Sequence, residues 1–172
     1  MASGQKKVVV RTFDGAVAWG YLPQSGFVEQ DSVELMAVDG RLSGHAVNEI
    51  KTISYVRDFN LDDKVDPERM GRRTFQARPR GDGLWVKLTF RDGEELEGLT
   101  TFDVGVVDSV LEDGGIFVRP PDVRGNTQRI FVPRTALRSL EVLGFVTAPS
   151  KRIAGKAGAG VVADTQTRLF GE

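Results

Sequence analysis

Hydrophobic and polar residues alternate in two stretches of the chain, and both stretches end in the same turn signal. Residues 6–13 read KKVVVRTF and precede an Asp-Gly pair at 14–15, and residues 84–91 read LWVKLTFR and precede an Asp-Gly pair at 92–93. Apolar residues at a spacing of two share one face of a strand. Asp-Gly favours a tight hairpin turn because the central residues of that turn need positive φ. Each stretch therefore predicts two antiparallel strands joined by a tight turn.

The match between the two stretches extends beyond their turns. Aligning the Asp-Gly pairs superposes Val8 on Val86, Val10 on Leu88, Thr12 on Phe90 and Gly20 on Gly98. We expect the apolar members of this set to be buried in two equivalent cores. A glycine inside a strand marks a bulge, a bend or a close backbone approach, and we expect both glycines at bent or bulged positions.

The ends of the two copies also correspond. EIKTISYV closes the first copy and ALRSLEVL closes the second, and their apolar residues have spacings of three and then two. A spacing of three suits a single 3₁₀ turn that leads into a last strand. With the strands between, the sequence predicts a tandem duplication of about five short strands per copy.

An apolar strand, Asp-Gly, a second strand with glycine and a long third strand together resemble the first motif of Sm-like proteins. The resemblance covers about residues 6–59 and 84–145, and it implies two tandem Sm/SH3-like small β-barrels. For the Sm type it further implies ring assembly and RNA binding, although the Arg-Gly of the second Sm motif is replaced by NEIKTI and RTALRSL. KKVVVRTFDGAVAWGY and ISYVRDF also resemble an uncharacterised bacterial domain family, often found in tandem or beside regulatory domains.

The sequence thus predicts an all-β fold with four regions. Residues 1–60 form a first Sm/SH3-like barrel, 61–83 an Arg-rich and partly helical linker, 84–148 a second barrel, and 149–172 a flexible tail rich in Gly and Ala.

Composition narrows the class of protein further. The chain of 172 residues has a net charge of −1, which argues against nucleic-acid binding by the whole surface but not against a local basic patch. It has no cysteine, so disulfides and Cys-based zinc sites are excluded. The N-terminus has no long apolar segment of a signal peptide, and no apolar run is long enough to span a membrane. We therefore expect a cytoplasmic protein, and the resemblance to a bacterial domain family implies a bacterial one.

A run of arginines in the linker is the main candidate site. It consists of Arg69, Arg72, Arg73, Arg78 and Arg80, with Phe75 among them as a stacking surface for a base. One interpretation is a solvated linker that forms ion pairs with the preceding acids. A second is an RNA or nucleotide site, because guanidinium groups grip phosphates. Thirdly, RRTFQAR resembles the arginine motif of cyclic di-nucleotide-binding PilZ domains, but DSVLEDGG does not match their second motif.

Little in the chain favours catalysis or a cofactor. His45 is the only histidine, and without a nucleophile and an orienting group we interpret it as structural. No motif for a cofactor or a metal is present, so we expect none. QTRLF near the C-terminus matches the loose pattern of peptides that dock on the bacterial sliding clamp, with Gln166, Leu169 and Phe170 as anchors.

We conclude from the sequence that the chain is a non-catalytic binding or adaptor protein of bacterial regulation. The alternative is an RNA or cyclic di-nucleotide binder that uses the Arg-rich linker. An enzyme of unknown type is the third interpretation. A protein is the expected partner, oligomerisation is compatible with the sequence, and no membrane partner is expected.

Overall fold

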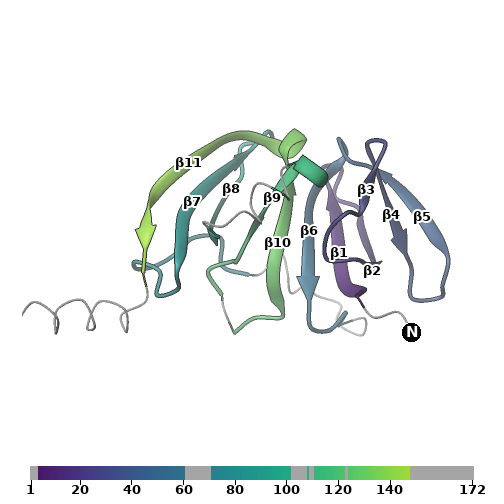
Figure 1. Cartoon of the computed structure of the whole chain (residues 1–172), viewed down its shortest axis with the longest axis horizontal. Coiled ribbons are helices and arrows are strands. Elements are labelled where there is room, and N and C mark those ends of the chain that lie inside the picture. Colours follow the sequence, from purple (N-terminus) through teal and green to yellow (C-terminus); the bar gives the residue numbers. More distant parts are fainter. Residues whose placement is uncertain (1–3, 61–70, 102–107, 109–110, 123, 148–172) are drawn as a thin grey trace, which may run out of the picture.

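The protein is all-β, as the sequence predicts. The computed structural model in Figure 1 describes residues 4–60, 71–101, 108, 111–122 and 124–147. The strands of the first half are β1 (Lys6–Thr12), β2 (Val17–Leu22), β3 (Val28–Glu29), β4 (Ser32–Met36), β5 (Leu42–Ala46) and β6 (Ile50–Val56). Those of the second half are β7 (Gly83–Phe90), β8 (Glu95–Thr100), β9 (Gly115–Val118), β10 (Thr127–Pro133) and β11 (Leu137–Val146), with a 3₁₀ turn η1 (Arg134–Ala136) before β11.

The described strands form two sheets, and neither sheet closes into a barrel. The larger sheet has the order β3-β4-β2-β1-β6-β10-β9, with β5 paired to β4, and the smaller has the order β11-β7-β8. One antiparallel bridge between Leu99 and Arg119 joins β8 to β9, with backbone hydrogen bonds of 3.0 and 2.8 Å. The closed tandem barrels expected from the sequence therefore remain a prediction.

The two halves repeat one strand order. In the first half the order is β6-β1-β2-β4-β5, and in the second it is β11-β7-β8-β9-β10, with the last strand beside the first in both. The registers agree as well, because Val8 lies opposite Gly20 and Val86 lies opposite Gly98. These equivalent pairings are what the alignment of the two Asp-Gly hairpins predicts.

Gly20 and Gly98 occupy regular strand positions, not bulges. The pairing of β1 with β2, and of β7 with β8, passes through them without a shift of register. A Cβ at Gly20 would lie 2.5 Å from the Met36 carbonyl oxygen, and a Cβ at Gly98 would lie 2.7 Å from Val118 Cβ. The two glycines are needed because a neighbouring strand approaches closely.

A shared β-bulge explains the spacing of three in the last strands. The register of β1 with β6 shifts between Arg11 and Thr12, which leaves Lys51 in the bulge. The register of β7 with β11 shifts between Leu137 and Ser139, which leaves Arg138 at the equivalent place. The 3₁₀ turn predicted there does precede β11, but the bulge adds the extra residue that separates the apolar positions.

The halves have separate hydrophobic cores. Burial is confirmed for all five predicted core residues, which are Val8, Val10, Val86, Leu88 and Phe90. Val8 and Val10 lie in the first core, which also contains Phe131 from the second half. The second core forms around Val86, Leu88 and Phe90, and Phe13 of the first half packs against it. Each core is thus completed by a side chain from the other half.

The halves meet where β6 pairs with β10, at the centre of Figure 1. Ile53 of β6 lies opposite Phe131 of β10, whose ring packs edge-on to Phe27 at 5.0 Å. Beyond the strand ends, Asp58 N–H donates to Asn126 Oδ1 at 2.9 Å, and Asn126 Nδ2 donates to the Asp58 carbonyl at 2.7 Å. These contacts make one continuous β-structure of the two halves.

Among the residues that the structure describes, no helix is long and apolar enough to cross a membrane.

Candidate functional site

The described part of the Arg-rich linker, residues 71–82, is anchored to the second half. Glu97 of β8 contacts the linker at Arg73 and Phe75 and also holds Trp85 of β7. Its backbone N–H donates to the Arg73 carbonyl at 2.7 Å, and its Oε2 accepts hydrogen bonds from Phe75 N–H at 3.1 Å and Trp85 Nε1 at 3.0 Å. The Phe75 and Trp85 rings meet edge-to-face, with centroids 6.0 Å apart. The linker therefore holds its side chains in defined positions over β7 and β8.

The arginines of the run differ in their contacts. Arg73 forms an ion pair with Glu94 at 3.5 Å, and the guanidinium of Arg78 donates to the Phe145 carbonyl at 2.7 Å. Arg72 and Arg80 are exposed. Arg69 lies outside the described residues, as do the acids expected to pair with the run. Two arginines thus hold the linker in place, and two present their side chains to solvent.

Arg72 and Arg73 line a groove at the junction of the halves, which we call the junction groove. Its volume is about 220 Å³. Its wall includes Arg11 of β1, Thr52 and Ser54 of β6, and Asn126 and Thr127 at the start of β10. Guanidinium and hydroxyl groups donate hydrogen bonds, so this lining suits an anion. One carboxylate, that of Asp122, also lies in the wall.

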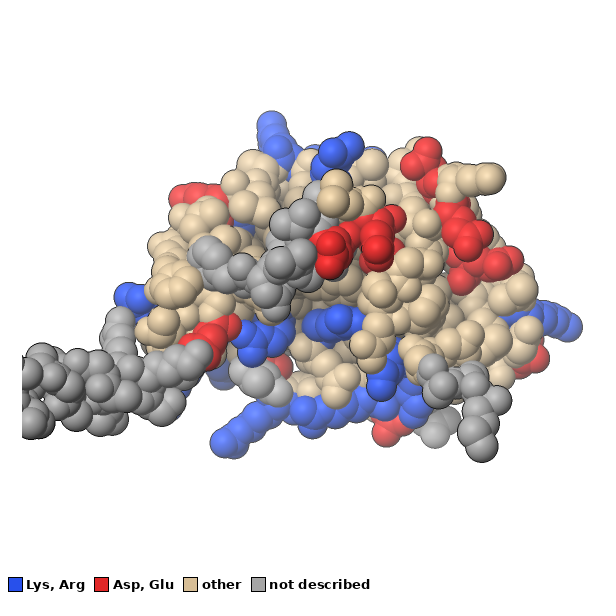
Figure 2. Space-filling view, viewed as in Figure 1, with Lys and Arg blue, Asp and Glu red and all other residues tan. Residues whose placement is uncertain are grey.

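A second groove runs along the linker and meets the junction groove at Arg72. This linker groove has a volume of about 260 Å³, and Phe75, Arg78 and Arg80 line it. Arg72 belongs to both grooves, and the adjacent Pro120 and Pro121 contribute one residue to each. On the face shown in Figure 2, a run of Lys and Arg side chains lies along the lower edge of the molecule. We call the two grooves together the basic track, because they share Arg72.

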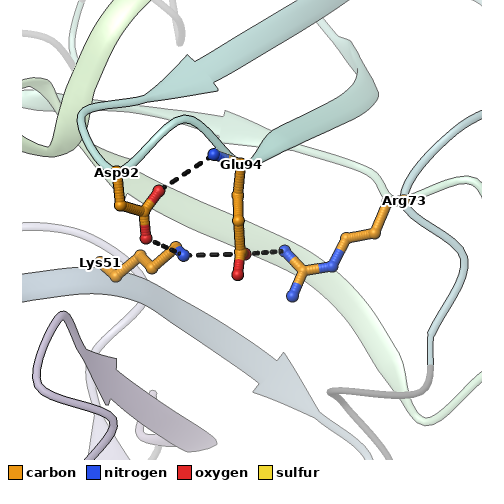
Figure 3. A network of polar contacts seen from close by, with 4 residues as sticks. All are labelled: Lys51, Arg73, Asp92 and Glu94. Atoms are coloured by element: carbon orange, nitrogen blue, oxygen red, sulfur yellow. Dashed lines mark hydrogen bonds and ion pairs between the residues drawn. The ribbon is translucent and has the colours of Figure 1, made fainter.

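The buried cation Lys51 lies next to the basic track, because it shares the carboxylate of Glu94 with Arg73. Lys51 Nζ forms ion pairs with Asp92 and, at 2.8 Å, with Glu94, which also contacts Arg73 (Figure 3). The same ammonium lies 5.7 Å from the Phe13 ring centroid and 5.2 Å from that of Phe90. Burial acts to raise the pKa of Asp92, but hydrogen bonds from Lys51 and Glu94 N–H outweigh it and hold this pKa below its usual value.

A third and larger cavity is less suited to an anion, although size alone would favour it. It has a volume of about 600 Å³ and is lined by Arg119 and Arg129, but also by Asp108 and Glu112. Its arginines have structural contacts. The Arg129 guanidinium lies 4.4 Å from the Tyr55 ring centroid and donates to the Gln24 carbonyl at 3.1 Å, and Arg119 donates to the Asp82 carbonyl. We therefore place the candidate site in the basic track.

Two buried groups have shifted pKa values and structural contacts, and Asp113 connects the halves. Burial raises the pKa of Asp113, whose Oδ1 accepts a hydrogen bond from Phe27 N–H at 3.2 Å. Burial also raises the pKa of Tyr55, whose hydroxyl donates to the Pro23 carbonyl at 2.8 Å.

His45 lies half-buried on β5, with Nε2 3.2 Å from Ser43 Oγ. In the described part of the chain, no three His, Cys, Asp or Glu residues gather as metal ligands would.

Sequence reasoning missed half of the basic track. Arg11, Thr52, Ser54 and Asn126 join it only because β6 pairs with β10, a contact between distant parts of the chain. One available signal was that Arg11 points to the face opposite Val8 and Val10, where a charged residue needs water or a polar partner. The proposed clamp-binding residues Gln166, Leu169 and Phe170 lie outside the described residues.

Comparison with known proteins gives one match. Residues 4–144 match the model of a family of unknown function, DUF6982. No curated protein and no solved structure is similar enough to the chain to count as a match.

Proposed function

The chain belongs to DUF6982, and we propose that it is a non-catalytic binding protein that holds single-stranded RNA in its basic track. The observation that carries this proposal is the position of Arg72, which lines both the junction groove and the linker groove. An extended polyanion can follow such a track, with successive phosphates meeting Arg11, Arg72 and Arg80. The protein-adaptor function is the alternative if no nucleic acid binds.

The sizes of the grooves favour an extended strand over a compact ligand. Pockets that enclose a drug-sized molecule measure about 300–1,000 Å³. The junction groove of about 220 Å³ and the linker groove of about 260 Å³ are each smaller. Each suits one phosphate or one base, whereas a cyclic di-nucleotide would need both at once in a compact shape. Single-stranded RNA therefore fits the two grooves better than the cyclic di-nucleotide of the PilZ-like interpretation.

Phe75 adds a surface on which a base can stack. It is half-buried, and its edge-to-face contact with Trp85 fixes the orientation of its ring. Stacking of one base on an aromatic ring contributes about 1–3 kcal/mol and tolerates any base. We therefore expect weak binding with little sequence preference.

We further propose that each half is a small barrel unit of the Sm/SH3-like type. The shared strand order, with the last strand beside the first, supports this assignment.

Fluorescence anisotropy with a labelled single-stranded RNA oligonucleotide tests the RNA-binding proposal. We expect binding at low salt that weakens with added salt, with a log–log slope of about −0.7 for each phosphate contact. Arg72→Ala with Arg80→Ala should weaken binding and reduce the slope by about 1.4, because two contacts are lost. Both side chains are exposed, so the variant should keep its stability.

Lys6→Ala with Arg134→Ala is the matched control. These two exposed residues carry the same charge but line neither groove. Equal losses of affinity in both double variants would contradict a local site, and absence of binding at low salt would remove RNA as the ligand.

A further inference from the structure

The two ends of the molecule each present an edge strand. β11 pairs with β7 and β5 pairs with β4, and neither has a second neighbour among the described strands. They lie at opposite ends in Figure 1. Such edges are templates for pairing with another strand, and soluble proteins usually protect them with lysines, prolines or short length. β11 has ten residues, and none of them is lysine or proline.

β11 is exposed on both faces, and one of these faces carries two neighbouring apolar side chains. Leu140 is 45% exposed and Val142 is 54% exposed, and the two side chains share one face of the strand because they are two residues apart. Their equivalents in the first half are Ile53 and Tyr55, since Leu140 lies opposite Leu88 as Ile53 lies opposite Val10. Ile53 and Tyr55 are 0% and 2% exposed. The difference arises because β10 pairs with β6 and covers it, whereas no described strand covers β11 in this way.

The pairing of β10 with β6 at the junction indicates which strand would pair with β11. The fourth strand of the second half, β10, pairs antiparallel with the last strand of the first half, β6. The corresponding strand of the first half is β5, the strand before its last, because β5 pairs with β4 as β10 pairs with β9. By this correspondence, β5 is the strand that would pair with β11. Each molecule contains one β5 edge and one β11 edge.

The β6–β10 pairing also fixes a register. Met36 corresponds to Arg119, because Tyr21 pairs with Met36 as Leu99 bridges to Arg119. This correspondence equates Leu42 with Arg129 and Gly44 with Phe131. Transferring the β6–β10 register then sets Val142 opposite Leu42, Glu141 opposite Ser43 and Leu140 opposite Gly44.

The side chains at these positions are compatible. Leu42 is 62% exposed, so its pairing with Val142 would bury two exposed apolar side chains together. Gly44 leaves room for Leu140, because a Cβ at Gly44 would meet only Ser32 Oγ, at 3.6 Å. The three pairs oppose no like charges, which would destabilise a cross-strand pair.

We propose that β11 of one molecule pairs antiparallel with β5 of a second copy of the chain, repeating between molecules the junction that joins the halves within one. The contact is head-to-tail, so each molecule still presents one free β5 and one free β11. Successive copies then form a closed ring if the rotation per copy closes, and a filament otherwise. The proposal depends on the fold alone and does not require RNA binding.

Complementary single variants test the proposal on the full chain. We expect the wild-type protein to form assemblies larger than a dimer as concentration rises, measured by size-exclusion chromatography with light scattering. Val142→Lys should block the β11 edge and Leu42→Lys the β5 edge, so each variant alone should be monomeric. Both side chains are exposed, and equal melting temperatures in circular dichroism will show that the variants fold.

Mixing the two variants is the decisive step. Leu42→Lys keeps an intact β11 and Val142→Lys keeps an intact β5, so an equimolar mixture should form a dimer and nothing larger. Leu111→Lys, at an apolar residue that is 77% exposed and belongs to neither edge strand, should assemble like the wild type. A wild-type protein that stays monomeric at all concentrations, a Leu42→Lys variant that still assembles alone, or a mixture that does not dimerise would each overturn the proposal.

Discussion

β6 and β11 occupy the same place in the two halves, but their environments differ. All seven residues of β6 are buried, whereas most of β11 is exposed. Both strands pair with the first strand of their half, and both carry a bulge at the same point. The local sequence pattern therefore determines the strand and its bulge, and the neighbouring half determines whether the strand becomes a core element.

The bulge residues show the same contrast. Lys51 lies in the β6 bulge, where its side chain is only 8% exposed and pairs with Asp92 and Glu94 of the second half. Arg138 lies in the equivalent β11 bulge and is exposed. A long cationic side chain at this position can thus remain in water, as Arg138 does. In the first half, the equivalent Lys51 is buried at the junction and forms ion pairs with the second half.

The largest expected effect concerns the residue that closes the first core. Phe131 is fully buried in that core, and Phe131→Ala should lower the free energy of unfolding by about 3–5 kcal/mol. Its counterpart Gly44 is exposed, and Gly44→Ala should change stability by about 0.5 kcal/mol or less. Urea denaturation of both variants measures the difference. Similar effects at the two positions would show that β5 and β10 are not in different environments.

The second prediction compares the equivalent residues of the two last strands. Ile53→Ala should cost about 2–5 kcal/mol, because it removes a buried side chain and leaves a cavity. Leu140→Ala should cost less than about 1 kcal/mol in the dilute, monomeric protein. If the same variant costs more at concentrations where the protein associates, Leu140 is buried by assembly. A large cost in the dilute monomer would show that β11 is already covered.

The third prediction concerns a feature that the halves share. Gly20→Ala and Gly98→Ala should each destabilise the protein by about 1–3 kcal/mol, because the added Cβ meets the neighbouring strand. Differential scanning calorimetry should show a lower melting temperature for both variants. Gly44→Ala is the control, since its Cβ has only ordinary contacts. An effect at only one of the two positions would weaken the equivalence of the halves.

The sequence predicts what depends on local pattern. The alternation around Val8 and Val86 and the two Asp-Gly turns were sufficient for the two hairpins and the buried face. It did not predict the β6–β10 pairing, because which strands meet across the halves depends on long-range contacts that leave no periodic signal. The groove residues Thr52 and Ser54 were missed for that reason, since in a separate first half they would be ordinary polar strand residues.

The smallest effect expected is a difference in proton binding between the two turn aspartates. Asp14 and Asp92 are equivalent, and both have a pKa below the usual 3.8. For Asp14 the cause is its own turn, through hydrogen bonds from the Thr12 hydroxyl and Ala16 N–H. For Asp92 the cause includes Lys51 of the other half. Lys51→Met should therefore raise the pKa of Asp92 and leave that of Asp14 unchanged.

The sign of the stability effect follows from the direction of the shift. A carboxyl group whose pKa is lowered by folding stabilises the folded state above its unfolded pKa, here 3.8, and the contribution is lost as the pH falls through the lower folded value. The wild-type protein should thus lose this contribution below about pH 4, whereas Lys51→Met should lack most of it. Carboxyl ¹³C titration by NMR measures both pKa values directly. Equal shifts at Asp14 and Asp92 in the variant would show that Lys51 does not act through its ion pair across the junction.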